Sequence, residues 1–171
     1  EEESTPEGCT LNGTMTIEGW KHSERARSEW IAKARFCVLG HRTYVKGADG
    51  RFRLTYLGID GWCPVVTLGG ARAVMAWGIA NGLLLETVDL ESAYLQEAWP
   101  DTAPPAYLRL TPEVLDCMPS DLWVAGMCAK PVFRMTKCLY GHALSGRYFV
   151  EGVVRLLKSK RFNRVSGFRM I

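Results

Sequence analysis

Asp89 is the residue whose surroundings point most clearly to chemistry. It follows the apolar run at residues 83–88, and Ala93 and Tyr94 come four and five residues later. A carboxylate at the end of a buried strand is a natural ligand for a hard cation such as Mg²⁺, because such ions prefer oxygen donors on a rigid support. An aspartate in this position also commonly caps the following turn, and the residues alone leave both interpretations equally open.

Two further segments carry basic side chains that suit an anion. Residues 33–42 read Lys-Ala-Arg-Phe-Cys-Val-Leu-Gly-His-Arg, and Leu139-Tyr140-Gly141 precedes Arg147 and a basic amphipathic stretch. Each segment is a weak signal by itself. A strand arginine is usually solvated or in a salt bridge, and Leu-Tyr-Gly is a common turn.

The elements that must position these residues alternate between helical and strand-like patterns. Thr67 suits a helix N-cap, Asn81-Gly82 suits a helix end, and Ser145 can cap the last helix. The mixture predicts an α+β fold with a small antiparallel sheet packed with helices. The expected elements are a mostly extended acidic leader at 1–19, a short helix at 20–32, a β-hairpin region at 33–57, a helix at 68–80, an apolar strand at 83–88, a helix or turn at 92–97, strands at 106–110 and 131–135, and a helix at 146–161.

Length and composition favour one globular domain. The chain has 171 residues, of which 47% are hydrophobic and 23% charged, so it can bury a core and is not expected to be disordered. Its longest apolar runs are far shorter than the ~20 residues that a membrane span needs, so no transmembrane segment is predicted.

The net charge of +3 conceals alternating blocks. Residues 19–72 carry ten basic and four acidic side chains, and residues 130–171 carry ten basic and one acidic. Residues 73–129, between them, carry eight acidic and one basic. Such blocks suit a protein that binds nucleic acid through its basic parts and cations through its centre, but they also suit oppositely charged faces of one soluble domain.

The six cysteines predict a reducing intracellular compartment. They are widely spaced, no C-x-x-C pair occurs, and the three histidines have no paired ligand spacing. A structural zinc site is therefore not expected, and each cysteine is interpreted as a small buried apolar residue. Nothing in these patterns separates cytoplasm, nucleus and organelle.

Five motifs follow one another in an order that is far more specific than any one of them. They are Lys33-Ala34-Arg35-Phe36-Cys37-Val38-Leu39-Gly40, Cys63-Pro64-Val65-Val66 with Arg72, Val88-Asp89 with Ala93-Tyr94-Leu95, Ala106-Tyr107-Leu108, and Leu139-Tyr140-Gly141 with Arg147 and Phe149, before Lys160-Arg161-Phe162. In this order the chain resembles the reverse transcriptase domain of copia-type LTR retrotransposons. The resemblance spans about residues 30–162. It implies that residues 20–171 hold the fingers and the first half of the palm.

The resemblance implies a metal-dependent RNA-directed DNA polymerase site. By similarity, Asp89 is the first catalytic and metal-binding aspartate, the carbonyl of Leu90 assists it, and Mg²⁺ is the cofactor of an active enzyme. Arg35, with Lys33 as a helper, contacts the triphosphate, where a planar guanidinium matches phosphate oxygens. Tyr94 is the aromatic gate beneath the sugar.

The remaining implied contacts are with nucleic acid. Gly141 allows the backbone to approach the template base pair, since it carries no side chain. Arg147, Arg155 and Lys158 face the nucleic-acid backbone from the last helix.

Departures from the family pattern weigh against catalysis. The Leu-Lys-Gln-Ala-Pro that follows the Leu-Tyr-Gly motif in the family is replaced by residues 142–146, His-Ala-Leu-Ser-Gly. No Tyr-x-Asp-Asp motif occurs, and no acidic residue follows Glu151. One aspartate cannot hold two Mg²⁺ ions. If these residues are the whole protein, we expect no polymerase activity.

The sequence is compatible with three functions. The preferred hypothesis is a reverse transcriptase-derived structural or interaction subunit of a larger assembly, with protein partners. The alternative is a fragment of an active retrotransposon polymerase, favoured by Arg35, Asp89 and Tyr94. The third is a non-catalytic nucleic-acid-binding module that uses the basic blocks 19–72 and 130–171.

Overall fold

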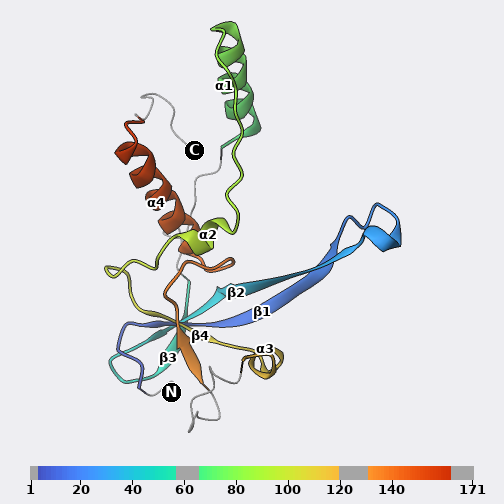
Figure 1. Ribbon diagram of the computed structural model, residues 1–171. Coiled ribbons are helices and arrows are strands. Elements are labelled where there is room, and N and C mark those ends of the chain that lie inside the picture. The colour runs from blue at the N-terminus through green and yellow to red at the C-terminus, as the bar shows by residue number, and fades with distance from the viewer. Residues whose placement is uncertain (1–3, 57–65, 120–130, 163–171) are drawn as a thin grey trace.

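The computed structural model describes residues 4–56, 66–119 and 131–162 (Figure 1). These residues form a five-stranded sheet, three short helical segments and two longer helices. The elements are β1 (Thr10–Lys21), the 3-10 turn η1 (Arg27–Glu29), β2 (Ile31–Lys46), β3 (Phe52–Thr55), α1 (Leu68–Ala80), α2 (Ala93–Gln96), β4 (Ala106–Arg109), α3 (Pro112–Asp116), β5 (Val132–Arg134) and α4 (Ser145–Ser159).

The sheet is mixed, with the strand order β3-β2-β1-β4-β5. β1 and β2 are antiparallel from Thr10 to Lys21 with a register shift between Asn12 and Thr14, whereas β4 pairs parallel to β1 over Thr10–Gly13 only. The α+β class is therefore confirmed, but the expected antiparallel sheet is wrong in one pairing. The long connection between β1 and β4 allows the chain to return in the same direction, which a short hairpin cannot do.

Beyond Gly13, the β1–β2 pair continues as a two-stranded ribbon that extends away from the body (Figure 1). Residues 10–19 of the expected leader form most of β1, so the ordered domain begins before residue 20. The helix expected at 20–32 is wrong, because this stretch ends β1, turns through η1 and begins β2. Trp20 pairs with Ala32 across the ribbon, and such non-local pairing overrides a weak local helical pattern.

The apolar strand expected at 83–88 is also wrong. These residues carry no regular secondary structure and follow α1 as an exposed segment. Leu84 is 85% exposed and Val88 is 83% exposed. Asp89 is thus presented by an exposed segment rather than by a buried strand.

The two longer helices were predicted correctly from local sequence signals. The helix at 68–80 is confirmed as α1, and the Oγ1 atom of Thr67 accepts a hydrogen bond from Gly70 N–H at 3.1 Å, as an N-cap does. The last helix is confirmed as α4, but Ser145 does not cap it. The Ser145 hydroxyl accepts from Leu139 N–H at 3.0 Å and ties the preceding turn to the helix.

The β2–β3 hairpin and the strands near residues 106 and 132 are confirmed. Cys63, Pro64 and Val65 of the second motif lie outside the described residues. In the ranges that the structure describes, no helix is long and apolar enough to span a membrane.

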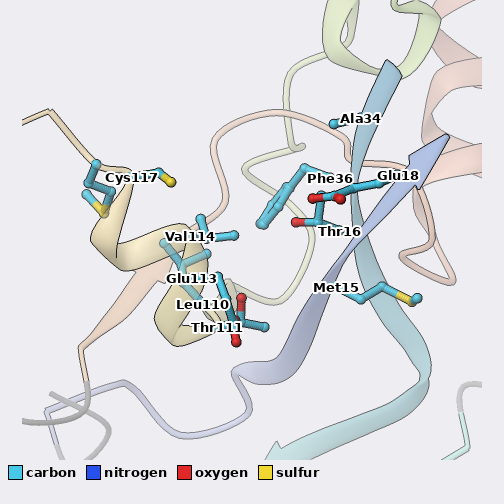
Figure 2. Close-up of a pocket in the computed structure, with 11 residues that line it drawn as sticks. Met15, Thr16, Glu18, Ala34, Phe36, Leu110, Thr111, Glu113, Val114 and Cys117 are labelled. Atoms are coloured by element: carbon cyan, nitrogen blue, oxygen red, sulfur yellow. The ribbon is translucent and has the colours of Figure 1, made fainter. Parts of the chain in front are cut away.

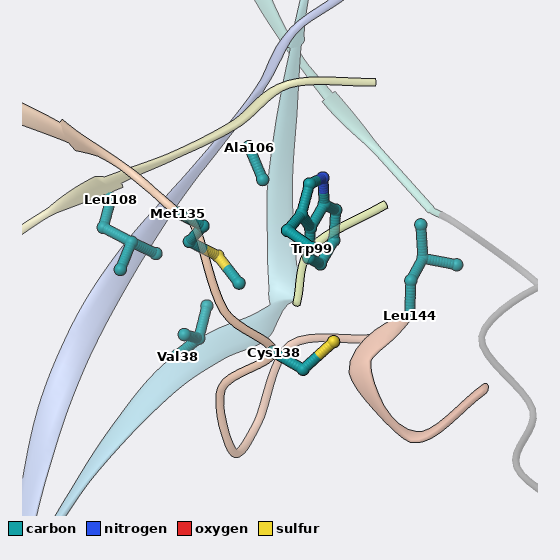
Figure 3. Close-up of a cluster of buried hydrophobic side chains, with 7 residues drawn as sticks. All are labelled: Val38, Trp99, Ala106, Leu108, Met135, Cys138 and Leu144. Carbon is teal, nitrogen blue, oxygen red and sulfur yellow. The ribbon is translucent and has the colours of Figure 1, made fainter. Parts of the chain in front are cut away.

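The core lies where the sheet meets the turn before α4 (Figure 3). Trp99 is its largest member, and the rings of His142 and Tyr148 meet it edge-on at 4.7 and 5.2 Å. Such edge-on contacts are favourable beyond the area they bury. The buried members are Val38, Trp99, Ala106, Leu108, Met135, Cys138 and Leu144.

Candidate functional site

A pocket of about 710 Å³ forms where β2, the segment before α2 and the turn before α4 come together. We call it the Arg35–Asp89 pocket. It brings into one place three of the stretches that the sequence singled out, although Lys33 and Tyr140 are more than 100 residues apart in the chain. Its lining residues are Lys21, Lys33, Ala34, Arg35, Phe36, Asp89, Leu90, Glu91, Ser92, Leu95, Leu139 and Tyr140.

One wall of the pocket is basic. Lys33 pairs with Gly19 in the ribbon, so Lys21, Lys33 and Arg35 alternate onto the same face of β1 and β2. Among the described residues, no carboxylate forms an ion pair with any of these three cations. Their charges therefore make this wall of the pocket positive, which suits an anionic group.

The opposite wall is acidic and is made by residues 89–92. Ser92 has a left-handed backbone (φ 49°, ψ 42°), which side-chain-bearing residues rarely adopt. Its carbonyl accepts a hydrogen bond from Leu95 N–H at 2.8 Å, which begins α2 immediately afterwards. The strained residue thus turns the chain sharply after Asp89 and Glu91, and it leaves both carboxylates along the pocket.

The oxygen donors of this wall have the chemistry that Mg²⁺ prefers. Asp89 and Glu91 supply two carboxylates, and Leu90 lies between them. Within the described ranges, no group of three or more histidine, cysteine, aspartate or glutamate side chains is arranged to hold a metal. Mg²⁺ at Asp89 and Leu90 therefore stays a prediction.

Tyr94 takes a different place from Tyr140. The Tyr94 ring stacks on Tyr140 at 4.8 Å and lies 5.3 Å from the ring of Phe149 on α4. Tyr140, rather than Tyr94, is among the residues that line the pocket. Tyr140 and Phe36 are thus the aromatic residues of the lining, and Tyr94 contacts the pocket only through Tyr140. The gate role of Tyr94 stays a prediction.

Gly141 has a positive φ of 87° and packs directly against the backbone of Val38. A Cβ atom at this position would overlap the Val38 carbonyl oxygen. Val38 N–H also donates to the Tyr140 carbonyl at 2.7 Å, so the turn is bonded to β2. The glycine is thus required for the turn to reach the strand, whatever else approaches it.

The three basic residues expected on α4 do share one stripe of that helix, at spacings of eight and three residues. Arg147 bonds Glu151 at 2.9 Å, and Arg155 bonds Glu97 at 2.9 Å. Both are paired with carboxylates, while Lys158 lies in the exposed last turn. Gly152 allows Glu97 to lie against α4, because its missing Cβ leaves room for that carboxylate.

The structure therefore gathers Lys33, Arg35, Asp89 and Leu90 around one pocket, and places Tyr94 and Gly141 just behind it. Arg147, Arg155 and Lys158 lie on α4 instead. Sequence reasoning missed the roles of Lys21, Glu91, Ser92 and Tyr140 in lining the pocket. The period-two alternation of β1 could have pointed to Lys21, but only if residues 14–21 had been recognised as a strand.

No protein family, curated protein or solved structure matches the chain.

Proposed function

We propose that this chain is a reverse transcriptase-derived module that acts as an interaction subunit of a larger assembly and does not catalyse alone. The collinear motifs support the derivation, as does the meeting of Arg35 and Asp89 at one pocket. The observation that carries the interaction role is α1 together with residues 83–90.

α1 is apolar on nearly every side yet largely exposed. Trp77 is 63% exposed and Ile79 is 69% exposed, and the segment that follows exposes Leu84 and Val88 even more. The helix extends away from the sheet (Figure 1). It makes at most isolated contacts with the other described helices and strands. A helix that is apolar all round is normally buried, and large exposed apolar patches mark protein interaction sites.

The test is whether the native protein needs this surface for assembly. A chain with Trp77→Glu and Ile79→Lys should leave the large complex that wild type occupies in gel filtration of native extract. Its far-UV circular dichroism should stay unchanged, because α1 adds little to the packing of the sheet. The matched control is Leu54→Asp, which adds a charge at an exposed apolar residue of β3. A wild-type chain that elutes as a monomer refutes the proposal.

Phosphate binding at the Arg35–Asp89 pocket is a second candidate function. The observation that favours it is that Lys21, Lys33 and Arg35 line the pocket and form no ion pair with a carboxylate among the described residues. The phosphates of a nucleoside triphosphate or of a nucleic-acid strand would pair with these cations. Binding would weaken steeply with salt if several phosphates are contacted.

Titration of the purified chain with a nucleoside triphosphate, with and without Mg²⁺, tests this second function. Arg35→Ala should weaken binding, whereas Arg51→Ala, a solvent-exposed arginine away from the pocket, should not. The alternative of an active polymerase predicts Mg²⁺-dependent primer extension that Asp89→Asn abolishes. Absence of extension by the native full-length protein counts against that alternative.

A further inference from the structure

β1 has an open edge over most of its length. On one side it pairs with β2 as far as Lys21, but on the other side β4 pairs only with Thr10–Gly13. The Thr14 hydroxyl makes a last contact with the Arg109 carbonyl at 3.0 Å. Past that point no strand of the described residues covers β1. Such an edge presents unpaired backbone N–H and C=O groups to a further strand.

A groove opens beside this edge because the chain turns away after β4. Leu110 and Thr111 lead into α3, which diverges from β1 and leaves a cavity of about 870 Å³ between them. Figure 2 shows Phe36 and Val114 on opposite sides of this groove. Its lining is mainly apolar, and its size falls in the range of ligand-binding sites.

Two carboxylates are the charged groups among the described residues that line the groove. Glu18 lies on β1 and Glu113 lies at the start of α3. The Glu113 carboxylate accepts hydrogen bonds from its own backbone N–H and from the Thr111 hydroxyl. These bonds lower the pKa of Glu113, so this side chain is ionised at neutral pH. Within the described part of the chain, neither carboxylate forms a salt bridge. The groove is thus complementary to a ligand that carries both apolar and basic groups.

Side chains alternate between the two faces of the ribbon, and this alternation decides how the apolar and basic groups of a bound strand must be spaced. Glu18 pairs with Ala34 and Thr16 pairs with Phe36, so all four point to the groove face. Lys33 and Arg35 point to the opposite, basic face of the ribbon. A strand that continues the sheet along β1 would therefore place every second side chain over Phe36 and Glu18. Its intervening side chains must be uncharged or acidic, because they emerge on the basic face.

We propose that a partner protein adds an extended segment to the free edge of β1 and fills this groove. Backbone hydrogen bonds to residues 15–20 supply affinity, and alternate side chains supply specificity. The segment carries an apolar residue over Phe36 and Val114, and a lysine or arginine two positions away against Glu18 or Glu113. The surface is separate from α1, so this inference goes beyond the docking proposed above.

The probe is the peptide acetyl-Thr-Lys-Thr-Val-Thr-Lys-Thr-amide, whose pattern is the same in either strand direction. It should bind the full chain and slow amide hydrogen exchange at residues 15–20. Glu18→Lys combined with Glu113→Lys should weaken binding by roughly fivefold, since two ion pairs become two repulsions. The same variant should bind better to the peptide with glutamate in place of lysine. Both positions are exposed, so circular dichroism should be unchanged.

Backbone methylation gives a test that does not depend on how the variant folds. Two peptides N-methylated on alternate residues should differ, because only one set of N–H groups faces β1. Equal binding of the two peptides overturns the proposal, as does no binding by the unmethylated peptide. Unchanged affinity in the charge-reversed chain overturns it too. Self-association of the free chain with slowed exchange at residues 15–20 would overturn the partner and assign the edge to a second copy.

Discussion

Acidification from pH 7 to pH 5 is expected to destabilise this protein through one buried histidine. His142 is 4% exposed, and burial lowers its pKa from the usual 6.5 to about 4. The unfolded chain therefore takes up a proton near pH 6.5, whereas the folded chain resists it until about pH 4. Stability is fully present above pH 6.5 and is lost as the pH falls toward 4.

The magnitude follows from the two pKa values. Their difference corresponds to about 3.4 kcal/mol of unfolding free energy once both states are protonated. Between pH 7 and pH 5 the same linkage gives a loss of about 1.8 kcal/mol. That is a large share of the roughly 5–15 kcal/mol by which domains are stable.

Urea unfolding at pH 7 and pH 5 measures this loss directly. The Nδ1 atom of His142 accepts a hydrogen bond from Leu144 N–H at 3.2 Å. The substitution His142→Asn removes the titrating ring but can place an amide oxygen near the same position as an acceptor. This variant loses ring packing against Trp99, so it should be less stable at both pH values, but its stability should change little between them. His41→Asn, at an exposed position, is the matched control and should keep the wild-type loss. A variant at residue 142 that loses as much stability as wild type would refute the reasoning.

Three further predictions concern backbone and thiol sites. Gly141→Ala should lower the unfolding free energy by about 2–3 kcal/mol in urea denaturation, because the backbone at Gly141 has a positive φ and Val38 occupies the space of a Cβ atom. Gly19→Ala, whose Cβ atom meets nothing within 4 Å, should lower it far less. Equal losses in the two variants would contradict the close packing of Gly141 on Val38. Ser92→Gly should raise the thermal midpoint through relief of roughly 1 kcal/mol of left-handed strain, and a lowered midpoint would count against that strain. Exposed Cys117 should react with a thiol reagent at pH 7, whereas buried Cys138 should react only in denaturant, because desolvation raises the pKa of Cys138 to about 11. Peptide mass mapping distinguishes the two thiols, and prompt labelling of Cys138 in the native protein would contradict its burial.

Helices with complete local signals were predictable from sequence. α1 has its N-cap at Thr67 and its end at Asn81-Gly82, and these signals act within a few residues of chain. α4 was predictable from its apolar face alone. The role of Ser145 was not, because its hydroxyl bonds a residue in the preceding turn rather than the start of its own helix.

The strand assignments failed where pairing is distant. The Trp20 to Trp30 region looks helical in isolation, yet Trp20 lies on β1, and its ring is 6.0 Å from the ring of Trp30, which directly precedes β2. Residues 83–88 have a strand-like composition, but the described sheet has no strand beside them. A strand exists only when a neighbour pairs with it, so its formation is decided by the rest of the chain.

The residues that can do chemistry were readable from the sequence: Arg35 and Lys33 in one motif, Asp89 in another, and a glycine at 141. That the Val38 backbone leaves no room for a Cβ atom at Gly141 is a property of the fold. Which of these residues lie together depends on the fold. It placed the basic face of the ribbon opposite residues 89–92, put Tyr140 rather than Tyr94 at the pocket, and paired Arg147 and Arg155 with carboxylates. Residue type is local, but proximity between residues far apart in the chain depends on strand pairing and packing.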